Sequence, residues 1–302
     1  MEYFLKACKA AILLGCYLFP ADAAPQSCNC PNYAELRSKY EISKEGSETY
    51  ISKLQATGNN VCKALAQEWL AEEYLAAGNF DTAEIHLQKA EQIYKALKCN
   101  DSLQINLYKI WAQLYYSKAD YPNSQEYCFK LLKAAEASGN AYETGNCYTM
   151  IAQLFNQTKQ ADKGVVYTRL AVPFLDQIKN DEKKLELLYK ISKRYLWHFQ
   201  DTKTQSSLDS SEILIRQQLN LALKKNNTDY AGKAFNHLQG IAWEKGDLKT
   251  ALSLLDSSFK YTPSENYDNL GTNYYDKADI YIELKQYDKA RQMADSALRY
   301  RK

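Results

Sequence analysis

Apolar residues recur three or four positions apart through most of the chain beyond residue 60. In the stretch 69–83, Trp69 and Tyr74 precede the polar pair Gly78-Asn79, and a second apolar-periodic segment begins at Phe80. Such spacing places side chains on one face of a helix, and Gly tolerates the positive φ at which helices often end. The pattern predicts two helices joined by a short turn.

The same arrangement occurs four times, and an aromatic residue or Leu follows each turn. The four stretches are 69–83, 111–121, 238–251 and 278–290. From Phe80 to Tyr121 is 41 residues (121 − 80), and from Leu248 to Tyr287 is 39 (287 − 248). A repeat of this length is typical of stacked helix pairs, in which each pair buries its apolar face against its neighbours.

The residue types within each repeat resemble the tetratricopeptide repeat, which carries Trp, Leu-Gly and Tyr in its first helix and Ala, Phe and Ala in its second. Small residues such as Ala71, Ala83 and Gly164 stand where helix backbones cross closely. The family period is about 34 residues, so each repeat here is about six longer, and we expect the extra residues at 95–100 and 133–140. The resemblance implies an all-α, right-handed α/α superhelix of about six helix pairs.

The resemblance covers residues 61–302 and is weakest in the fourth repeat, where 201–211 is polar. Helical spacing in the segment 24–60 predicts a leading helix pair that caps the array. The repeats are expected near 61–100, 101–140, 141–180, 181–227, 228–266 and 267–302.

The first residues have the order of a secretory signal. Lys6 and Lys9 precede an apolar run over 10–19, and Ala21-Asp22-Ala23 follows Pro20. We therefore expect a signal peptide over 1–23 and export to the periplasm or cell envelope of a bacterium.

A lipid anchor is the alternative to cleavage after Ala23. Leu13-Leu14-Gly15-Cys16 resembles a lipobox, which would place the anchor on Cys16. The apolar run is too short for a transmembrane helix, and no longer apolar run follows.

Six cysteines follow the signal segment, and exported proteins commonly form disulfides. They are Cys28, Cys30, Cys62, Cys99, Cys128 and Cys147. Cys62 begins the first helix of its pair and Cys99 ends the second, so antiparallel packing predicts a Cys62–Cys99 disulfide, with Cys28 or Cys30 as competitors for either thiol. Cys128 and Cys147 are equally suited to be buried free thiols.

The composition excludes several classes of function. The net charge is +2 with both signs scattered along the chain, which argues against a nucleic acid partner. The three histidines, His86, His198 and His237, are far apart, and no catalytic, phosphate-binding or metal-binding motif occurs. We expect no enzyme activity, no cofactor and no metal.

The resemblance implies a concave groove lined by the first helix of each pair. Its expected lining residues are mostly amides and aromatics, whose donors and acceptors suit the backbone of an extended peptide. They are Asn106, Lys109, Gln113, Tyr116, Asn146, Thr149, Gln153, Asn156, Lys233, Asn236 and Trp243. Simple solvated helix faces would show the same residue types.

These features favour an exported scaffold that binds a protein or peptide. The alternative is the extracytoplasmic sensor portion of a bacterial signal-transduction protein, such as a histidine kinase or a regulator linked to such repeats. At the C-terminal edge, Met293, Leu298 and Tyr300 with Tyr274 and Tyr281 predict an exposed apolar strip that is covered by self-association, a partner or further repeats.

Overall fold

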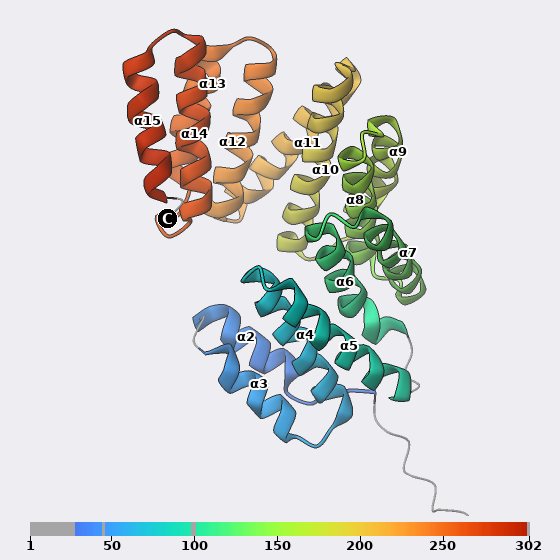
Figure 1. Ribbon diagram of the computed structural model, residues 1–302. Helices are drawn as coiled ribbons and strands as arrows, with labels where there is room; N and C mark the ends of the chain where they lie inside the picture. The colour runs from blue at the N-terminus through green and yellow to red at the C-terminus, as the bar shows by residue number, and fades with distance from the viewer. Residues whose placement is uncertain (1–27, 44–45, 98–100, 301–302) are drawn as a thin grey trace, which may run out of the picture. The chain divides into compact units, whose positions relative to one another are not determined.

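The computed structural model describes residues 28–43, 46–97 and 101–300 and shows, within these ranges, α-helices, two short 3₁₀ segments and no strands (Figure 1). The predicted signal segment 1–23 and the alternative anchor at Cys16 lie outside them. The helices are α2 (Tyr33–Ser43), α3 (Ser47–Ala56), α4 (Asn60–Ala76), α5 (Phe80–Leu97), α6 (Ile105–Ser117), α7 (Tyr121–Ser138), α8 (Ala141–Gln157), α9 (Ala161–Ala171), α10 (Asp181–Thr202), α11 (Gln205–Lys224), α12 (Thr228–Glu244), α13 (Leu248–Tyr261), α14 (Tyr267–Glu283) and α15 (Tyr287–Tyr300). The all-α prediction is confirmed.

Consecutive helices pack as antiparallel pairs, such as α4 with α5 and α12 with α13. The pair α2 and α3 precedes the six pairs expected from the repeat. The chain forms two compact units, Met1–Ile110 and Trp111–Lys302, and α6 runs through the division between them. We call the first helix of each repeat, from α4 through α14 in alternation, an A helix.

The turn within a pair holds one residue in the left-handed region. It is Gly78 between α4 and α5 (φ 75°) and Gly246 between α12 and α13 (φ 76°). Ala119, Lys159 and Lys285 take the same place in three other pairs, at φ 58°, 60° and 57°. The next residue's N–H closes the turn in each, as in the bond from Asp247 to the Ala242 carbonyl at 2.9 Å. This hydrogen bond offsets the cost of positive φ in Ala and Lys.

Most A helices begin after an Asn whose side chain caps the helix. The carboxamide oxygen accepts from a backbone N–H of the first turn, as Asn227 accepts from Tyr230 at 3.1 Å. The caps are Asn59 before α4, Asn140 before α8, Asn180 before α10, Asn227 before α12 and Asn266 before α14. In these five helices the Asn sets the start of the helix, and with it the register of the side chains that face outward.

Gly164 permits the close crossing of α8 and α9. A Cβ at this position would lie 2.2 Å from Asn156 Oδ1 and 3.0 Å from the backbone oxygen of Ala152. Gly240 in α12 differs, because a Cβ there would meet Leu196 Cδ2 at an ordinary 3.8 Å.

Gly164→Ala is expected to destabilise the second unit by about 1–3 kcal/mol, since the added methyl forces α8 and α9 apart. Gly240→Ala is the matched control and should stabilise the same unit by about 0.5–1 kcal/mol, because Ala loses less backbone entropy in a helix. Urea unfolding followed by circular dichroism measures both. Equal effects of the two replacements would contradict the tight crossing.

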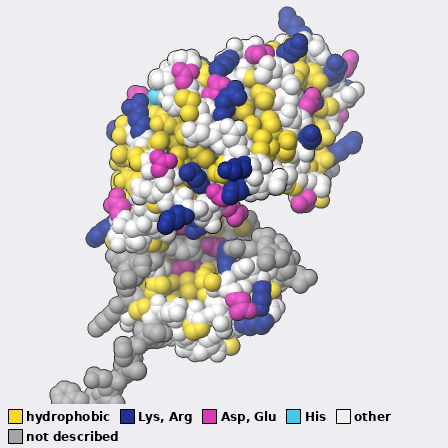
Figure 2. All heavy atoms as spheres, turned by 180° about the vertical axis from the view of Figure 1, so that it is seen from behind, with side chains coloured by type: hydrophobic (Ala, Val, Ile, Leu, Met, Phe, Trp, Pro, Cys, Tyr) yellow, Lys and Arg dark blue, Asp and Glu magenta, His cyan; other side chains and the backbone are white. Residues whose placement is uncertain are grey.

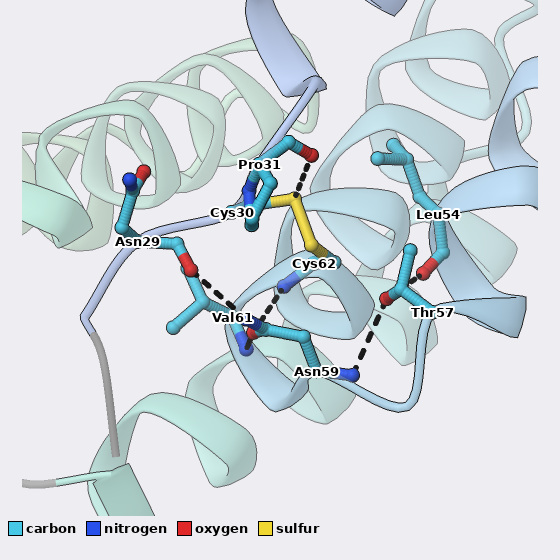
Figure 3. Close-up of a disulfide and its surroundings, with 8 residues drawn as sticks. All are labelled: Asn29, Cys30, Pro31, Leu54, Thr57, Asn59, Val61 and Cys62. Carbon is cyan, nitrogen blue, oxygen red and sulfur yellow. Dashed lines mark hydrogen bonds between the residues drawn. A yellow bond between two sulfur atoms is a disulfide. The ribbon is translucent and has the colours of Figure 1, made fainter. Parts of the chain in front are cut away.

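The N-terminal disulfide is one of the alternatives named from the sequence, with Cys30 as the competitor for Cys62, and not the Cys62–Cys99 pair. Cys62, at the start of α4, is bonded to Cys30, with their Cα atoms 4.9 Å apart (Figure 3). Asn59 holds the segment before α2 in place by donating to the Asn29 carbonyl at 3.0 Å. The predicted Cys62–Cys99 pair is therefore wrong, because Cys62 already has a partner that arrives from the N-terminal side; Cys99 lies outside the described residues. Cys128 and Cys147 are buried free thiols.

Candidate functional site

A cleft of about 420 Å³ opens in the second unit between the A helices α10, α12 and α14. Its size falls within the range of about 300–1,000 Å³ that ligand pockets occupy. The lining combines amides, aromatics and a few charges. It consists of Tyr189, Lys193, Leu196, Trp197, Gln200, Gly232, Lys233, Asn236, His237, Gln239, Gly240, Trp243, Ser258, Thr262, Asn269, Thr272, Asn273 and Asp276.

Helix α12 supplies the middle of this cleft. Lys233, Asn236, Gly240 and Trp243 follow one another at intervals of three or four residues, which places them along one face of the helix. Because Gly240 has no side chain, α12 leaves space beside Leu196 of α10 at this point. Three residues predicted for the groove, Lys233, Asn236 and Trp243, are thus brought together here.

Lys193 on α10 presents an ammonium group between two aromatic rings. Its Nζ lies 5.6 Å from the ring centre of Tyr189 and 5.2 Å from that of Trp197. No carboxylate pairs with it among the described residues. Burial lowers the pKa of Lys193, and the neighbouring Arg194 lowers it further.

Lys233 on α12 is held differently. Its Nζ donates to Asp229 Oδ2 at 2.6 Å, one turn earlier on the same helix. The charge of Lys233 is therefore already matched within the protein, while that of Lys193 is not.

Arg194 is a second cation beside Trp197. Only 7% of the residue is exposed, and its guanidinium carbon lies 4.1 Å from the Trp197 ring centre. Nη2 donates to Gln153 Oε1 of α8 at 2.9 Å, whereas Nε and Nη1 are buried without a partner among the described residues. Burial lowers the pKa of Arg194 to about 10, which leaves it charged at neutral pH.

His237 faces the cleft as a neutral ring. Ser211 Oγ donates to the Ser192 carbonyl at 2.8 Å and lies 3.1 Å from Nε2 of His237. Since the Ser211 proton is already used, His237 Nε2–H donates to Ser211, and Nδ1 is left as an acceptor. Burial, with a smaller contribution from Lys193, lowers the pKa of His237 to about 3.

Two amides of α12 present unused groups. Asn236 Nδ2 donates to Asn273 Oδ1 at 2.9 Å and to Asp276 Oδ2 at 2.7 Å, so its Oδ1 remains as an acceptor. Gln239 is 2% exposed, and its Nε2 has no partner in the part of the chain described. A buried donor without a partner costs free energy, which a ligand acceptor would recover.

Several other predicted groove residues bridge neighbouring A helices instead. In the first unit, Asn106 Nδ2 donates to Glu68 Oε2 at 2.9 Å and to Glu72 Oε1 at 3.1 Å. In the second, Asn146 Oδ1 accepts from Lys190 Nζ at 2.8 Å. Gln153 likewise accepts from Arg194. These side chains therefore link neighbouring A helices to each other.

The remaining predicted residues differ from one another in burial and in their contacts. Thr149 is buried, and its hydroxyl donates to the Asn146 carbonyl at 2.7 Å. Asn156 is buried against Gly164, between the two helices of its pair. Gln113 is exposed, Tyr116 packs beside Tyr121, and Lys109 interacts with the Glu68 carboxyl.

Lys193 and Trp197 were missed from the sequence because the fourth repeat is degenerate. The repeat period itself was a usable signal. Lys193 lies 40 residues after Gln153 (193 − 153) and 40 before Lys233 (233 − 193), at the offset already assigned to the groove. Trp197 follows Lys193 by one helical turn.

Other surfaces offer less chemistry. No described cluster of His, Cys, Asp and Glu has the arrangement of a metal site, and no described helix is both long and apolar enough to cross a membrane. Basic and acidic side chains are interspersed on the face drawn in Figure 2. At the C-terminal edge Leu298 is exposed, whereas Tyr274 and Tyr300 stack with ring centres 5.5 Å apart. Self-association there stays a prediction.

Comparison with known proteins finds likeness in structure alone. No family model matches the sequence, and no curated protein matches it. The apo form of RapI superposes with a TM-score of 0.63 at 14% identity, covering 88% of this chain and 95% of that one. NprR in complex with its cognate peptide NprX gives 0.57 at 14%, covering 88% and 77%.

A third similar structure is a signal transduction ATPase with a tetratricopeptide repeat sensor, PH0952 from Pyrococcus horikoshii. It gives a TM-score of 0.64 at 15% identity, and the match covers 88% of this chain but 42% of that one. With the helix pairs and their period, these likenesses show that the chain has a tetratricopeptide-type fold.

Proposed function

We propose that the chain is an exported, non-catalytic scaffold that binds a peptide or an extended protein segment in the cleft between α10, α12 and α14. The cleft holds groups that suit a peptide backbone. Asn236 offers an acceptor and Gln239 a donor, with the aromatic rings of Tyr189 and Trp197 beside them. An extended chain carries both an N–H and a C=O at each residue, so it can use both.

The observation that carries this proposal is the unpartnered Nε2 of Gln239, which is buried in the lining of the cleft. Proteins rarely leave a buried donor unsatisfied, and such a group at a concave surface indicates a missing acceptor. The peptide carried by NprR, which has the same type of fold, supports a peptide as the ligand class.

Export rests on the order of residues 1–23, with basic, apolar and small residues in succession. N-terminal sequencing of the secreted protein should begin at Ala24. A lipid-modified Cys16 at the N-terminus would instead support the anchored form.

A sensor role is the second candidate. The similar ATPase is described as having a tetratricopeptide repeat sensor, and this chain matches less than half of it. In that case the same cleft would receive the signal, and an output domain would be joined to the array.

Selection from displayed random peptides tests the binding function directly. Peptides of about twelve residues span ~40 Å when extended, enough to cross several A helices. The immobilised full chain should enrich specific sequences. Gly240→Phe, which fills the cleft, should weaken their binding about tenfold or more, since each ~1.4 kcal/mol of lost contact is a factor of ten.

Ser253→Phe provides the matched control, because Ser253 is exposed on α13 and does not line the cleft. It should leave peptide binding unchanged. Failure to enrich any sequence, or equal weakening by the two folded variants, would exclude the cleft as a peptide site.

A further inference from the structure

The α10 side of the cleft carries one cation, Lys193, that no described carboxylate neutralises. Lys193 lines the cleft and has no carboxylate partner among the described residues, whereas the neighbouring Arg194 does not line it and donates to Gln153 of α8. Burying a charge is costly unless an opposite charge or strong hydrogen bonds compensate it. A partly buried lysine that lines the cleft without an anion therefore points to an anion supplied by the ligand.

The carboxylates near the cleft do not supply this charge. Asp229 is paired with Lys233 and also accepts from Asn266 at 2.7 Å. Asp276 accepts from Asn236. Asp229 lies on α12 and Asp276 on α14, and neither forms an ion pair with Lys193 of α10.

We propose that the ligand is an acidic peptide, with a carboxylate that binds the Lys193 ammonium between the rings of Tyr189 and Trp197. This inference rests on the proposed peptide-binding function and specifies the ligand's chemistry. The ammonium lies 5.6 Å from the Tyr189 ring centre and 5.2 Å from that of Trp197, and Arg194 beside the same indole adds positive potential. Lys233, the other lysine that lines the cleft, is already paired with Asp229.

The partly buried position of Lys193 beside two aromatic rings strengthens an ion pair with a ligand carboxylate, relative to the same pair in open solvent. A partly buried ammonium has lost some of its water, so a carboxylate that reaches it gains a charge-assisted hydrogen bond in a medium of low dielectric. The same burial penalises a basic peptide, because a like charge would meet Lys193 without solvent screening. Acidic peptides should therefore be selected and basic ones rejected.

The peptide selection described above tests the inference with one added comparison. Sequences enriched on the wild-type full chain should carry Asp or Glu at a fixed position, and selection on Lys193→Gln should lose that preference. The control Lys249→Gln removes the same charge from the exposed side of α13, outside the cleft, and should keep the preference.

Synthetic versions of one enriched peptide then locate the carboxylate. Replacing its acidic residue by Gln should weaken binding about tenfold to a hundredfold, as expected for a charge-assisted bond. If the C-terminal amide weakens binding instead, the carboxylate is that of the peptide C-terminus. Because this arm changes the ligand alone, it is valid even if Lys193→Gln folds poorly.

The outcomes separate the two proposals. Enriched peptides without an acidic preference, bound equally by the wild type and a folded Lys193→Gln protein, would overturn the acidic ligand and leave peptide binding intact. No enriched peptide at all would overturn both.

Discussion

Replacing both Cys30 and Cys62 by Ala is expected to lower the free energy of unfolding of the first unit by about 3–4 kcal/mol. The disulfide joins residues 32 positions apart, and in the chain-entropy model a link of this length restricts the unfolded chain by that amount. The segment before α2 would also lose its covalent attachment to α4. Hydrogen exchange of the α4 and α5 amides measures the change.

The second unit provides the internal control for this experiment. Its cysteines, Cys128 and Cys147, are free thiols, so reductant should leave the exchange of α8 and α12 unchanged. Cys28 is disulfide-bonded as well, so reductant breaks more than one link, whereas the double variant removes the Cys30–Cys62 bond alone. Non-reducing peptide mapping that found Cys62 joined to another residue would contradict the assignment.

The helices could be predicted from the sequence because cap and turn residues within each repeat mark where its helices begin and end. The Asn caps at Asn140 and Asn180 are one period apart (180 − 140 = 40), and the turn residues Gly78 and Ala119 nearly so (119 − 78 = 41). These signals are local, since cap and turn hydrogen bonds join residues close in sequence. The period then extends the pattern along the chain.

The partners of the polar side chains could not be predicted in the same way. Asn146 and Asn236 occupy A helices and look alike in sequence, yet Asn146 is held by Lys190 whereas Asn236 keeps a free acceptor in the cleft. Which amide is used depends on the residue one repeat away. The position of a residue on one helix face does not contain that information, because it does not say which residue of the neighbouring helix lies opposite.

The partner of Cys62 could not be predicted for a similar reason. Antiparallel packing brings the ends of α4 and α5 together, which made Cys99 a reasonable partner for Cys62. The segment before α2 approaches the same helix end from outside the repeat, and its path depends on contacts such as Asn59 with Asn29. Several connectivities fit one set of cysteines, and tertiary packing decides among them.

Glu68→Gln is expected to stabilise the first unit at pH 8 by about 3 kcal/mol. The side chain is fully buried in α4, and burial raises its pKa from 4.5 to about 7, against the opposing effect of the hydrogen bond from Asn106. A shift of this size corresponds to about 3 kcal/mol, at ~1.4 kcal/mol for each pH unit. Gln has nearly the same shape, can still accept from Asn106, and carries no charge to bury.

The pH dependence gives the sign of the effect. Below about pH 4.5 the carboxyl is protonated in both states, so the wild type and Glu68→Gln should have similar stability. Between about pH 4.5 and 7 the unfolded chain loses this proton while the folded one keeps it, so the wild-type stability falls as the pH rises. The variant should lack this fall.

Glu72→Gln is the matched control: Glu72 also accepts from Asn106, but it pairs with Arg37 at 2.6 Å, so its replacement should not stabilise the unit. Chemical denaturation of the three proteins from pH 4 to 8 makes the comparison, and parallel profiles for the wild type and Glu68→Gln would show that Glu68 ionises as readily in the folded unit as in the unfolded chain.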